Sequence, residues 1–209
     1  MLKQYKNLFS PPAIIQSVAE GIHLDFPGPL KNERRLFTEC IKSTQREGLI
    51  HSFFSERAIT KIPELASGKP VELKNIGIIG GGTMGTGISM AAMNAGYNVI
   101  MIEQNQGAID KALEKINSTY ERNVKLGRIT SDQKQQIMKL FSATIDMKEL
   151  KNRDLIIEAV FENMEVKKEV FIKLNDICSK NCILASNTSY LDVNEISTVV
   201  DNPSRVIGL

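Results

Sequence analysis

The spacing of apolar residues changes at about residue 71. Before this point apolar side chains recur at helical intervals and are interrupted by proline and glycine, which predicts short helices separated by turns. The predicted helices span 12–20, 31–46 and 49–58, with a turn-rich segment over 21–29 and a linker over 63–70. The second predicted helix has Leu36, Phe37, Cys40 and Ile41 on one side, and Phe53 and Phe54 are expected to be buried in the third. The segment holds too little apolar material for a core of its own, so we expect it to pack on another part of the protein.

From residue 71 onward, short apolar runs alternate with helical stretches. Parallel strands covered on both faces have such near-continuous apolar runs, and the helices between them supply the cover. The predicted strands span 75–79, 98–102, 155–160, 183–186 and 205–208, and the predicted helices span 83–95, 106–125, 131–141, 165–178 and 191–199. Thr130 and Gln133 have the spacing of a capping box at the start of the third of these helices. We therefore predict an α/β domain over 71–209, preceded by an N-terminal helical connector segment over 1–70.

Composition and charge narrow the choice of function only slightly. The net charge of +2 is spread along 209 residues without a dense basic block, so charge does not suggest a nucleic acid as partner. No apolar run approaches the roughly 18 residues that a membrane span needs. Cys40, Cys178 and Cys182 have no histidine pair nearby, so we expect reduced thiols and no metal site.

A glycine-rich segment follows the first predicted strand and opens a helix. In the dinucleotide-binding fingerprint the first glycine makes a tight turn, the second lets the backbone approach a pyrophosphate, and the third lets helix and strand pack closely. Gly80, Gly82 and Gly85 have this spacing, and the free N–H groups at the helix start favour phosphates. The expected cofactor-binding residues of the segment are Gly80, Gly81, Gly82, Thr83, Met84 and Gly85. The fold is then expected to be a Rossmann-type doubly wound parallel sheet.

Glu103 selects between the two nicotinamide cofactors. It lies 18 residues after Gly85, at the end of the second predicted strand. A carboxylate at this position can accept hydrogen bonds from the ribose hydroxyls and would repel a 2′-phosphate, which favours NAD over NADP. Two alternatives stay open: the glycines form only a tight turn beside a solvated glutamate, or the same fingerprint binds FAD.

Three motifs together resemble the 3-hydroxyacyl-CoA dehydrogenase family. They are the glycine segment with Glu103, residues 157–167 (IEAVFENMEVK), and Ser186-Asn-Thr-Ser189 followed by residues 205–209. The resemblance runs from about Lys74 to the end of the chain. Residues 11–66 resemble, more loosely, the connector between the hydratase and dehydrogenase parts of the peroxisomal type-1 multifunctional enzymes of fatty-acid β-oxidation.

The resemblance implies roles for individual residues. Glu162 would lie beside the nicotinamide end of NAD, Lys167 would reach its ribose, and Asn187 would lie in the loop that lines the site. Ser189 would be the catalytic residue that hydrogen-bonds the 3-oxygen of the substrate.

Each role also has a simpler alternative. Glu162 and Lys167 could be an ordinary charged pair near the start of a helix. Ser189 could cap the helix that follows its strand. Glu158, half inside an apolar strand, is expected to receive backbone N–H bonds that offset the cost of burying it.

The function implied by the resemblance is oxidation of a 3-hydroxyacyl-CoA to a 3-ketoacyl-CoA in fatty-acid β-oxidation, with NAD as hydride acceptor. The partner would be an acyl-CoA, with Thr119 and Lys125 near the family's CoA-binding positions. The location would be peroxisomal, with the mitochondrial matrix as the alternative. Two other functions stay open: a short, non-catalytic isoform that binds NAD, and a related hydroxyacid or sugar-acid dehydrogenase.

The general base of the family is a histidine, which by the resemblance would directly follow Leu209. The histidines of this chain, His23 and His51, lie in the connector. Losing a general base commonly lowers a rate by about 100- to 10,000-fold. We therefore expect the 209-residue chain to bind NAD with negligible dehydrogenase activity of its own, and to dimerise only through a further C-terminal domain.

Overall fold

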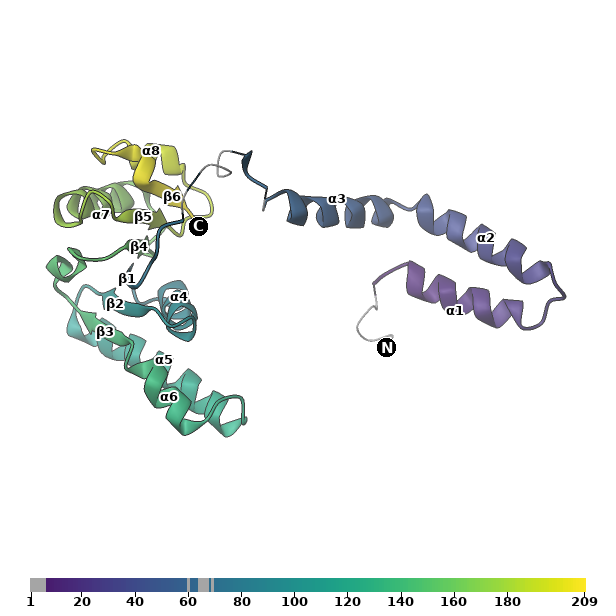
Figure 1. Cartoon of the computed structure of the whole chain (residues 1–209), viewed down its shortest axis with the longest axis horizontal. Helices are drawn as coiled ribbons and strands as arrows, with labels where there is room; N and C mark the ends of the chain where they lie inside the picture. Colours follow the sequence, from purple (N-terminus) through teal and green to yellow (C-terminus); the bar gives the residue numbers. More distant parts are fainter. Residues whose placement is uncertain (1–6, 60, 64–67, 69) are drawn as a thin grey trace. The chain divides into compact units, whose positions relative to one another are not determined.

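The computed structural model describes residues 7–59, 61–63, 68 and 70–209. The chain divides into two compact units, Met1–Pro70 and Val71–Leu209 (Figure 1). Most of the predicted linker over 63–70 lies outside the described residues. No helix within the described ranges is long and apolar enough to cross a membrane.

The N-terminal unit contains α1 (Ser10–Gly21), α2 (Gly28–Ile41) and α3 (Thr44–Ala58). Helices α1 and α2 pack against each other and lie side by side in Figure 1. Ala13 of α1 and Leu36 of α2 are buried. Of the other residues on the predicted apolar side of this helix, Cys40 is half-buried, whereas Phe37 and Ile41 are 53% and 41% exposed. A single neighbouring helix covers only part of the apolar face of α2.

The predicted helix over 31–46 is in fact two helices. The first ends at Ile41, and Ser43 is the N-cap of the next, where its hydroxyl accepts a hydrogen bond from the Arg46 N–H at 3.2 Å. A serine cap satisfies a free N–H of the new helix, and hydrophobic periodicity does not detect it. The third helix therefore begins before the predicted residue 49.

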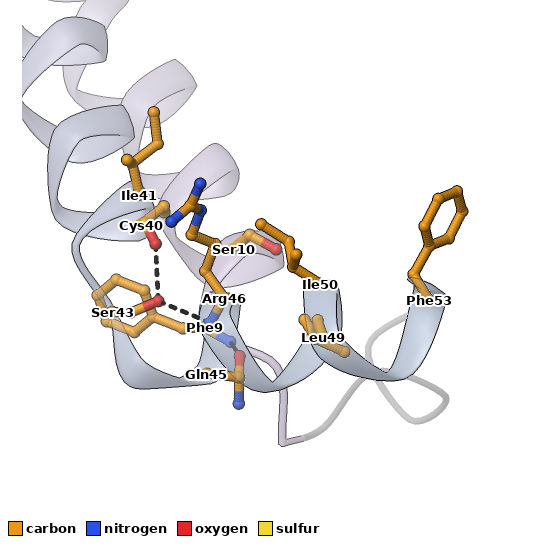
Figure 2. Close-up of a pocket in the computed structure, with 10 residues that line it drawn as sticks. All are labelled: Phe9, Ser10, Cys40, Ile41, Ser43, Gln45, Arg46, Leu49, Ile50 and Phe53. Atoms are coloured by element: carbon orange, nitrogen blue, oxygen red, sulfur yellow. Dashed lines mark hydrogen bonds between the residues drawn. The ribbon is translucent and has the colours of Figure 1, made fainter. Parts of the chain in front are cut away.

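Helix α3 has no buried residue. Phe53 and Phe54 are 49% and 62% exposed, which contradicts their predicted burial. Their rings contact each other edge to face with centroids 5.4 Å apart. Figure 2 shows an open pocket beside this helix, where the Gln45 side chain accepts a hydrogen bond from the Phe9 N–H. The pocket is lined by Phe9, Ser10, Cys40, Ile41, Ser43, Gln45, Arg46, Leu49, Ile50 and Phe53.

The C-terminal unit is built on a six-stranded parallel sheet. Its strands are β1 (Asn75–Ile79), β2 (Asn98–Ile102), β3 (Phe141–Thr144), β4 (Leu155–Glu158), β5 (Ile183–Ser186) and β6 (Val206–Gly208). Their order is β3-β2-β1-β4-β5-β6, and every neighbouring pair is parallel. The order reverses between β1 and β4, and ligands bind at the carboxyl ends of the strands at such a point. The predicted doubly wound parallel sheet is confirmed.

Helices cover both faces of this sheet. They are α4 (Thr83–Asn94), α5 (Gln106–Lys125), α6 (Ser131–Met138), α7 (Met164–Ile177) and α8 (Val193–Ser197), with short 3₁₀ turns η2 (Met147–Leu150) and η3 (Pro203–Arg205). Successive strand residues point to opposite faces, so Ile78 packs with Met93 and Ile116 of α4 and α5, whereas Ile79 belongs to the cluster with α7 and α8. The cluster that contains Ile79 also contains the buried, free thiols of Cys178 and Cys182.

Strand β3 is absent from the prediction. The helix predicted over 131–141 ends at Met138, although the capping box of Thr130 and Gln133 at its start is confirmed. β3 is an edge strand that pairs with β2 alone, and none of its four residues is fully buried. A strand with little burial has no distinct apolar run, so its residues looked like the end of a helical pattern.

Candidate cofactor site

The glycine segment forms a tight turn between β1 and α4. Gly80 has a φ of +97°, and a Cβ there would lie 2.7 Å from the Ala159 carbonyl oxygen. A Cβ on Gly85 would lie 1.7 Å from the carbonyl oxygen of Gly80. At Gly80 a side chain is excluded both by the contact with Ala159 and by the left-handed backbone conformation. At Gly85 it is excluded because α4 lies so close to the turn.

Gly82 is different, because none of the residues that the structure describes requires a glycine at this position. It is the N-cap of α4 with a φ of −66°, and a Cβ there would meet no atom of the described ranges within 4 Å. The open space lies at the start of a 12-residue helix whose first N–H groups have no helical acceptor. Thr83 and Met84, the first two residues of this helix, are exposed. A space that a side chain would fill, next to free N–H donors, fits a dinucleotide pyrophosphate.

Glu103 lies directly after β2 and is tied to the glycine turn. Its Oε1 accepts a hydrogen bond from the Gly81 N–H, and its Oε2 accepts one from the Gln104 N–H at 3.0 Å. A Cβ on Gly81 would come within 3.1 Å of the same Oε1. The carboxylate is therefore held beside the turn, where it can also meet a ribose.

Lys115 also reaches this place, although it is not among the residues predicted to bind the cofactor. It lies on α5, and its Nζ donates a hydrogen bond to the Thr83 Oγ1 at 3.3 Å. Helix α5 lies against the turn, because a Cβ on Gly81 would be 2.9 Å from the Cβ of Ala112. Lys115 lies one helical turn beyond Ala112, which is the only sequence signal that could have indicated it.

A buried ionic network lies across the switch point, at the ends of β4 and β5. The side chains of Glu158 and Lys167 are both 0% exposed, and Lys167 Nζ lies 2.7 Å from Glu158 Oε1. The same oxygen accepts the Val160 N–H at 2.7 Å, and Glu158 Oε2 accepts the Ser186 hydroxyl at 2.6 Å. The expected backbone N–H bond is present, but a buried ion pair and a buried hydroxyl complete the set.

Glu162 extends this network to the surface. Its Oε2 lies 3.3 Å from Lys167 Nζ, while its Oε1 accepts hydrogen bonds from the Thr188 hydroxyl and, at 3.3 Å, from the Ser189 N–H. The Thr188 hydroxyl, and then the neighbouring Lys167 ammonium, hold the pKa of Glu162 below its ordinary value. Glu162 and Lys167 are thus more than an exposed charged pair, because the lysine is buried between two carboxylates.

The loop after β5 carries the remaining predicted residues of this region. The Asn187 N–H donates to the Glu158 carbonyl oxygen at 2.9 Å, which extends the β4–β5 ladder by one bond. Ser189 is exposed, and its hydroxyl makes no hydrogen bond to any residue that the structure describes. Asp192, not Ser189, caps α8 through the Asn194 N–H, so the capping alternative for Ser189 is wrong.

Thr119 and Lys125 both lie on α5. This helix precedes, along the chain, the loops that contain Glu162 and Ser189. The Thr119 hydroxyl donates to the Lys115 carbonyl oxygen at 2.8 Å, and Lys125 is exposed at the last position of the helix. Their predicted contact with CoA stays a prediction, as do the roles of Glu162, Lys167, Asn187 and Ser189.

Comparison with known proteins identifies the family of this chain. The family model of the 3-hydroxyacyl-CoA dehydrogenase NAD binding domain matches residues 75–209. A peroxisomal fatty acid beta-oxidation multifunctional protein of Arabidopsis thaliana is 34% identical over 205 residues, 97% of this chain and 28% of the relative. A peroxisomal bifunctional enzyme of Cavia porcellus is 35% identical over 214 residues, which cover 100% of this chain and 29% of the relative. The chain thus spans less than a third of the curated relatives that it matches.

Solved structures show the same likeness. The (S)-3-hydroxybutyryl-CoA dehydrogenase of Ralstonia eutropha superposes with a TM-score of 0.64 at 31% identity, over 66% of this chain and 48% of that chain. The dehydrogenase part of multifunctional enzyme 1 from C. elegans gives 0.61 at 34% identity, over 67% of this chain and 32% of that chain. The chain therefore belongs to the 3-hydroxyacyl-CoA dehydrogenase family, and residues 75–209 are its NAD-binding domain.

Proposed function

We propose that this chain is the NAD-binding part of an enzyme that oxidises 3-hydroxyacyl-CoA to 3-ketoacyl-CoA in fatty-acid β-oxidation. The observation that carries the proposal is the pairing of two sites across the switch point of one sheet. The glycine turn with Glu103 lies at the ends of β1 and β2, and the loops with Glu162 and Ser189 follow β4 and β5. A dinucleotide bound in this crevice has one half over each side.

The residues present divide between the two halves of NAD. The first N–H groups of α4 and Lys115 would bind the pyrophosphate, and Glu103 would bind the adenosine ribose. Glu162 and Asn187 would then lie on the nicotinamide side. The Lys167 side chain has no exposed surface, which does not favour its predicted direct contact with the ribose. Lys167 would instead act on the cofactor through its ion pair with Glu162.

The chemistry of the site follows from its donors. When bound, NAD supplies the acceptor for the hydride that leaves C3 of the substrate. The exposed Ser189 hydroxyl can hydrogen-bond the 3-oxygen, but a serine has no capacity to take its proton without a base. Glu162 is a weaker base than an ordinary glutamate, because Thr188 and Lys167 stabilise its ionised form. The proton acceptor of the reaction is thus not supplied by the groups described around Ser189.

We further propose that the protein acts in peroxisomes on an acyl-CoA. The support is that relatives matching almost the whole chain, connector included, are named peroxisomal or glyoxysomal fatty acid beta-oxidation multifunctional proteins. No feature of the described residues favours the non-catalytic isoform or the hydroxyacid and sugar-acid dehydrogenase alternatives.

Titration calorimetry of the 209-residue chain with NAD and NADP tests the proposed cofactor site. We expect NAD to bind more tightly, because the Glu103 carboxylate repels the 2′-phosphate of NADP. A chain that is folded by circular dichroism and binds neither cofactor would refute the proposal.

The role of Ser189 needs a catalytic readout. In any form of the protein that reduces NAD with 3-hydroxybutyryl-CoA, Ser189→Ala should lower turnover and leave NAD affinity nearly unchanged. If NAD affinity falls by the same factor, Ser189 belongs to the cofactor site instead.

A further inference from the structure

Three charged side chains follow one another from the core of the C-terminal unit to its surface. Glu158 and Lys167 are fully buried, and the Glu162 side chain is 38% exposed. Lys167 Nζ is closer to Glu158 than to Glu162, at 2.7 Å against 3.3 Å. We call these three residues the charged triad. Two carboxylates and one ammonium give it a net charge of −1, and its exposed end is Glu162.

Stability alone is a weak explanation for such a triad. Moving an ion pair out of water costs several kcal/mol per ion, roughly as much as the pair regains, and apolar replacements are often as stable. Both carboxylate oxygens of Glu158 accept hydrogen bonds, from Lys167, the Val160 N–H and the Ser186 hydroxyl. Glu158, Ser186 and Lys167 lie on β4, β5 and α7, so the two buried charges are preorganised by regular elements.

Glu158 determines the net charge of the triad, because it compensates the charge of Lys167. If Lys167 paired with Glu162 alone, the two would neutralise each other. Because Lys167 is closer to Glu158, one negative charge in the triad is left uncompensated. Thr188 and the Ser189 N–H donate to Glu162 Oε1 and keep its carboxylate at the edge of the sheet, on the side where β4 and β5 end.

We propose that the charged triad makes this site prefer the oxidised, positively charged nicotinamide ring over the neutral reduced ring, with Glu158 as the residue that sets the net charge. The inference rests on the proposed function, which puts the nicotinamide end of NAD beside Glu162. A preorganised negative charge at a partly buried site attracts a cationic ring and gains nothing from a neutral one. Glu158 is a positioning residue in this scheme, since it acts through Lys167 and Glu162 and does not touch the cofactor itself.

The test is the ratio of the dissociation constants for NADH and NAD⁺, measured by calorimetry on the 209-residue chain at low salt. Glu158→Gln removes one charge and keeps the shape, because the glutamine oxygen can accept from Lys167 while the Ser186 hydroxyl becomes the acceptor of its amide. We expect this variant to weaken NAD⁺ binding more than NADH binding, lowering the ratio about three- to tenfold.

Charge rescue separates this role from a structural one. The double variant Glu158→Gln with Lys167→Met returns the triad to a net charge of −1 and leaves no buried charge, so the ratio should return to within about twofold of wild type. The matched control is Lys168→Met with Glu195→Gln, a surface pair at 2.7 Å that also involves α7. This control should leave the ratio unchanged.

Several outcomes would overturn the inference. Equal weakening of both cofactors by Glu158→Gln, or no recovery in the double variant, would mean that the triad only holds the fold. If Glu158→Gln does not fold, the triple variant Glu158→Gln, Lys167→Met, Glu162→Gln replaces it, because it has no net charge and contains no buried ion. A ratio of dissociation constants equal to that of the double variant would then refute the proposal. A wild-type chain that binds NAD⁺ and NADH equally refutes the triad's role but not the proposed function. A wild type that binds neither refutes both.

Discussion

Gly82 offers the sharpest test of where the cofactor lies. We consider Gly82→Val, because a Cβ at this position meets no atom within 4 Å in the part of the chain that the structure describes, and its φ of −66° suits any residue. The folded chain should therefore accept valine, with a loss of about 1 kcal/mol for replacing a glycine N-cap by an apolar residue. The valine side chain would instead occupy the open space in front of the α4 N–H groups.

The expected loss of NAD affinity follows from the donors that the valine would block. Hydrogen bonds to charged groups contribute about 1.5–3 kcal/mol each, so losing two of them to the pyrophosphate weakens binding by more than about 100-fold, or about 2.7 kcal/mol. Calorimetry with NAD measures this loss, and thermal unfolding measures the stability.

Two other glycines provide the comparison. At Gly85 the distance from a new Cβ to the Gly80 oxygen would have to open from 1.7 Å to at least 3.0 Å, so Gly85→Ala should destabilise the fold by about 3 kcal/mol or more. Gly87 is exposed on α4 with open space around it, so Gly87→Ala should stabilise the helix by up to about 1 kcal/mol and keep NAD affinity. If folded Gly82→Val binds NAD within about tenfold of wild type, a gap of about 1.4 kcal/mol, the pyrophosphate does not lie at Gly82.

Three further predictions concern single side chains. Glu103→Ser should reduce the preference for NAD over NADP to less than about threefold, because it removes the carboxylate that repels the 2′-phosphate; competition calorimetry measures this, and an unchanged preference would contradict it. Lys115→Met should weaken NAD binding about fivefold at low salt, because the substitution removes a cation beside the phosphates, and Lys115→Arg should retain the wild-type affinity. An NAD affinity of Lys115→Met equal to that of wild type at low salt would rule the contact out. Asp154 accepts the Lys74 and Asn75 N–H groups at 2.8 Å each, so Asp154→Ala should lower the free energy of unfolding by about 2 kcal/mol at neutral pH. These bonds lower the pKa of Asp154, so its stabilisation is complete above the unfolded pKa and is lost as the pH falls below about 4. A difference between wild type and variant that persists at about pH 2 would refute this assignment.

Much of the C-terminal unit could be predicted from local patterns. Strands 75–79, 98–102 and 183–186 have the predicted bounds, because strands buried on both faces have unbroken apolar runs. The glycine spacing and the position of Glu103 predicted the turn at the carboxyl end of β1. In these cases one segment of the chain contains all the information, since a turn and a helix start are determined by neighbouring residues.

The misses occur where burial depends on distant parts of the chain. β3 is an edge strand with little apolar signal, and the exposed Phe53 and Phe54 show that an apolar residue on a helix is buried only if another element packs against it. Element bounds were also less accurate where a strand end is polar, as at β4, which ends at Glu158 rather than residue 160.

Local sequence patterns were sufficient to predict the α/β class, the nucleotide turn and the residues that follow each strand. How those residues pair depends on the three-dimensional packing of the chain. Lys115 meets Thr83 from 32 positions away, and Ser186 meets Glu158 from 28 positions away. Lys167 was expected to reach the cofactor ribose, or to form an ordinary charged pair with Glu162, and neither expectation included its burial. It is buried because α7 packs on the sheet over the end of β4. Such contacts are set by the order of strands and the packing of helices on them, which no local pattern encodes.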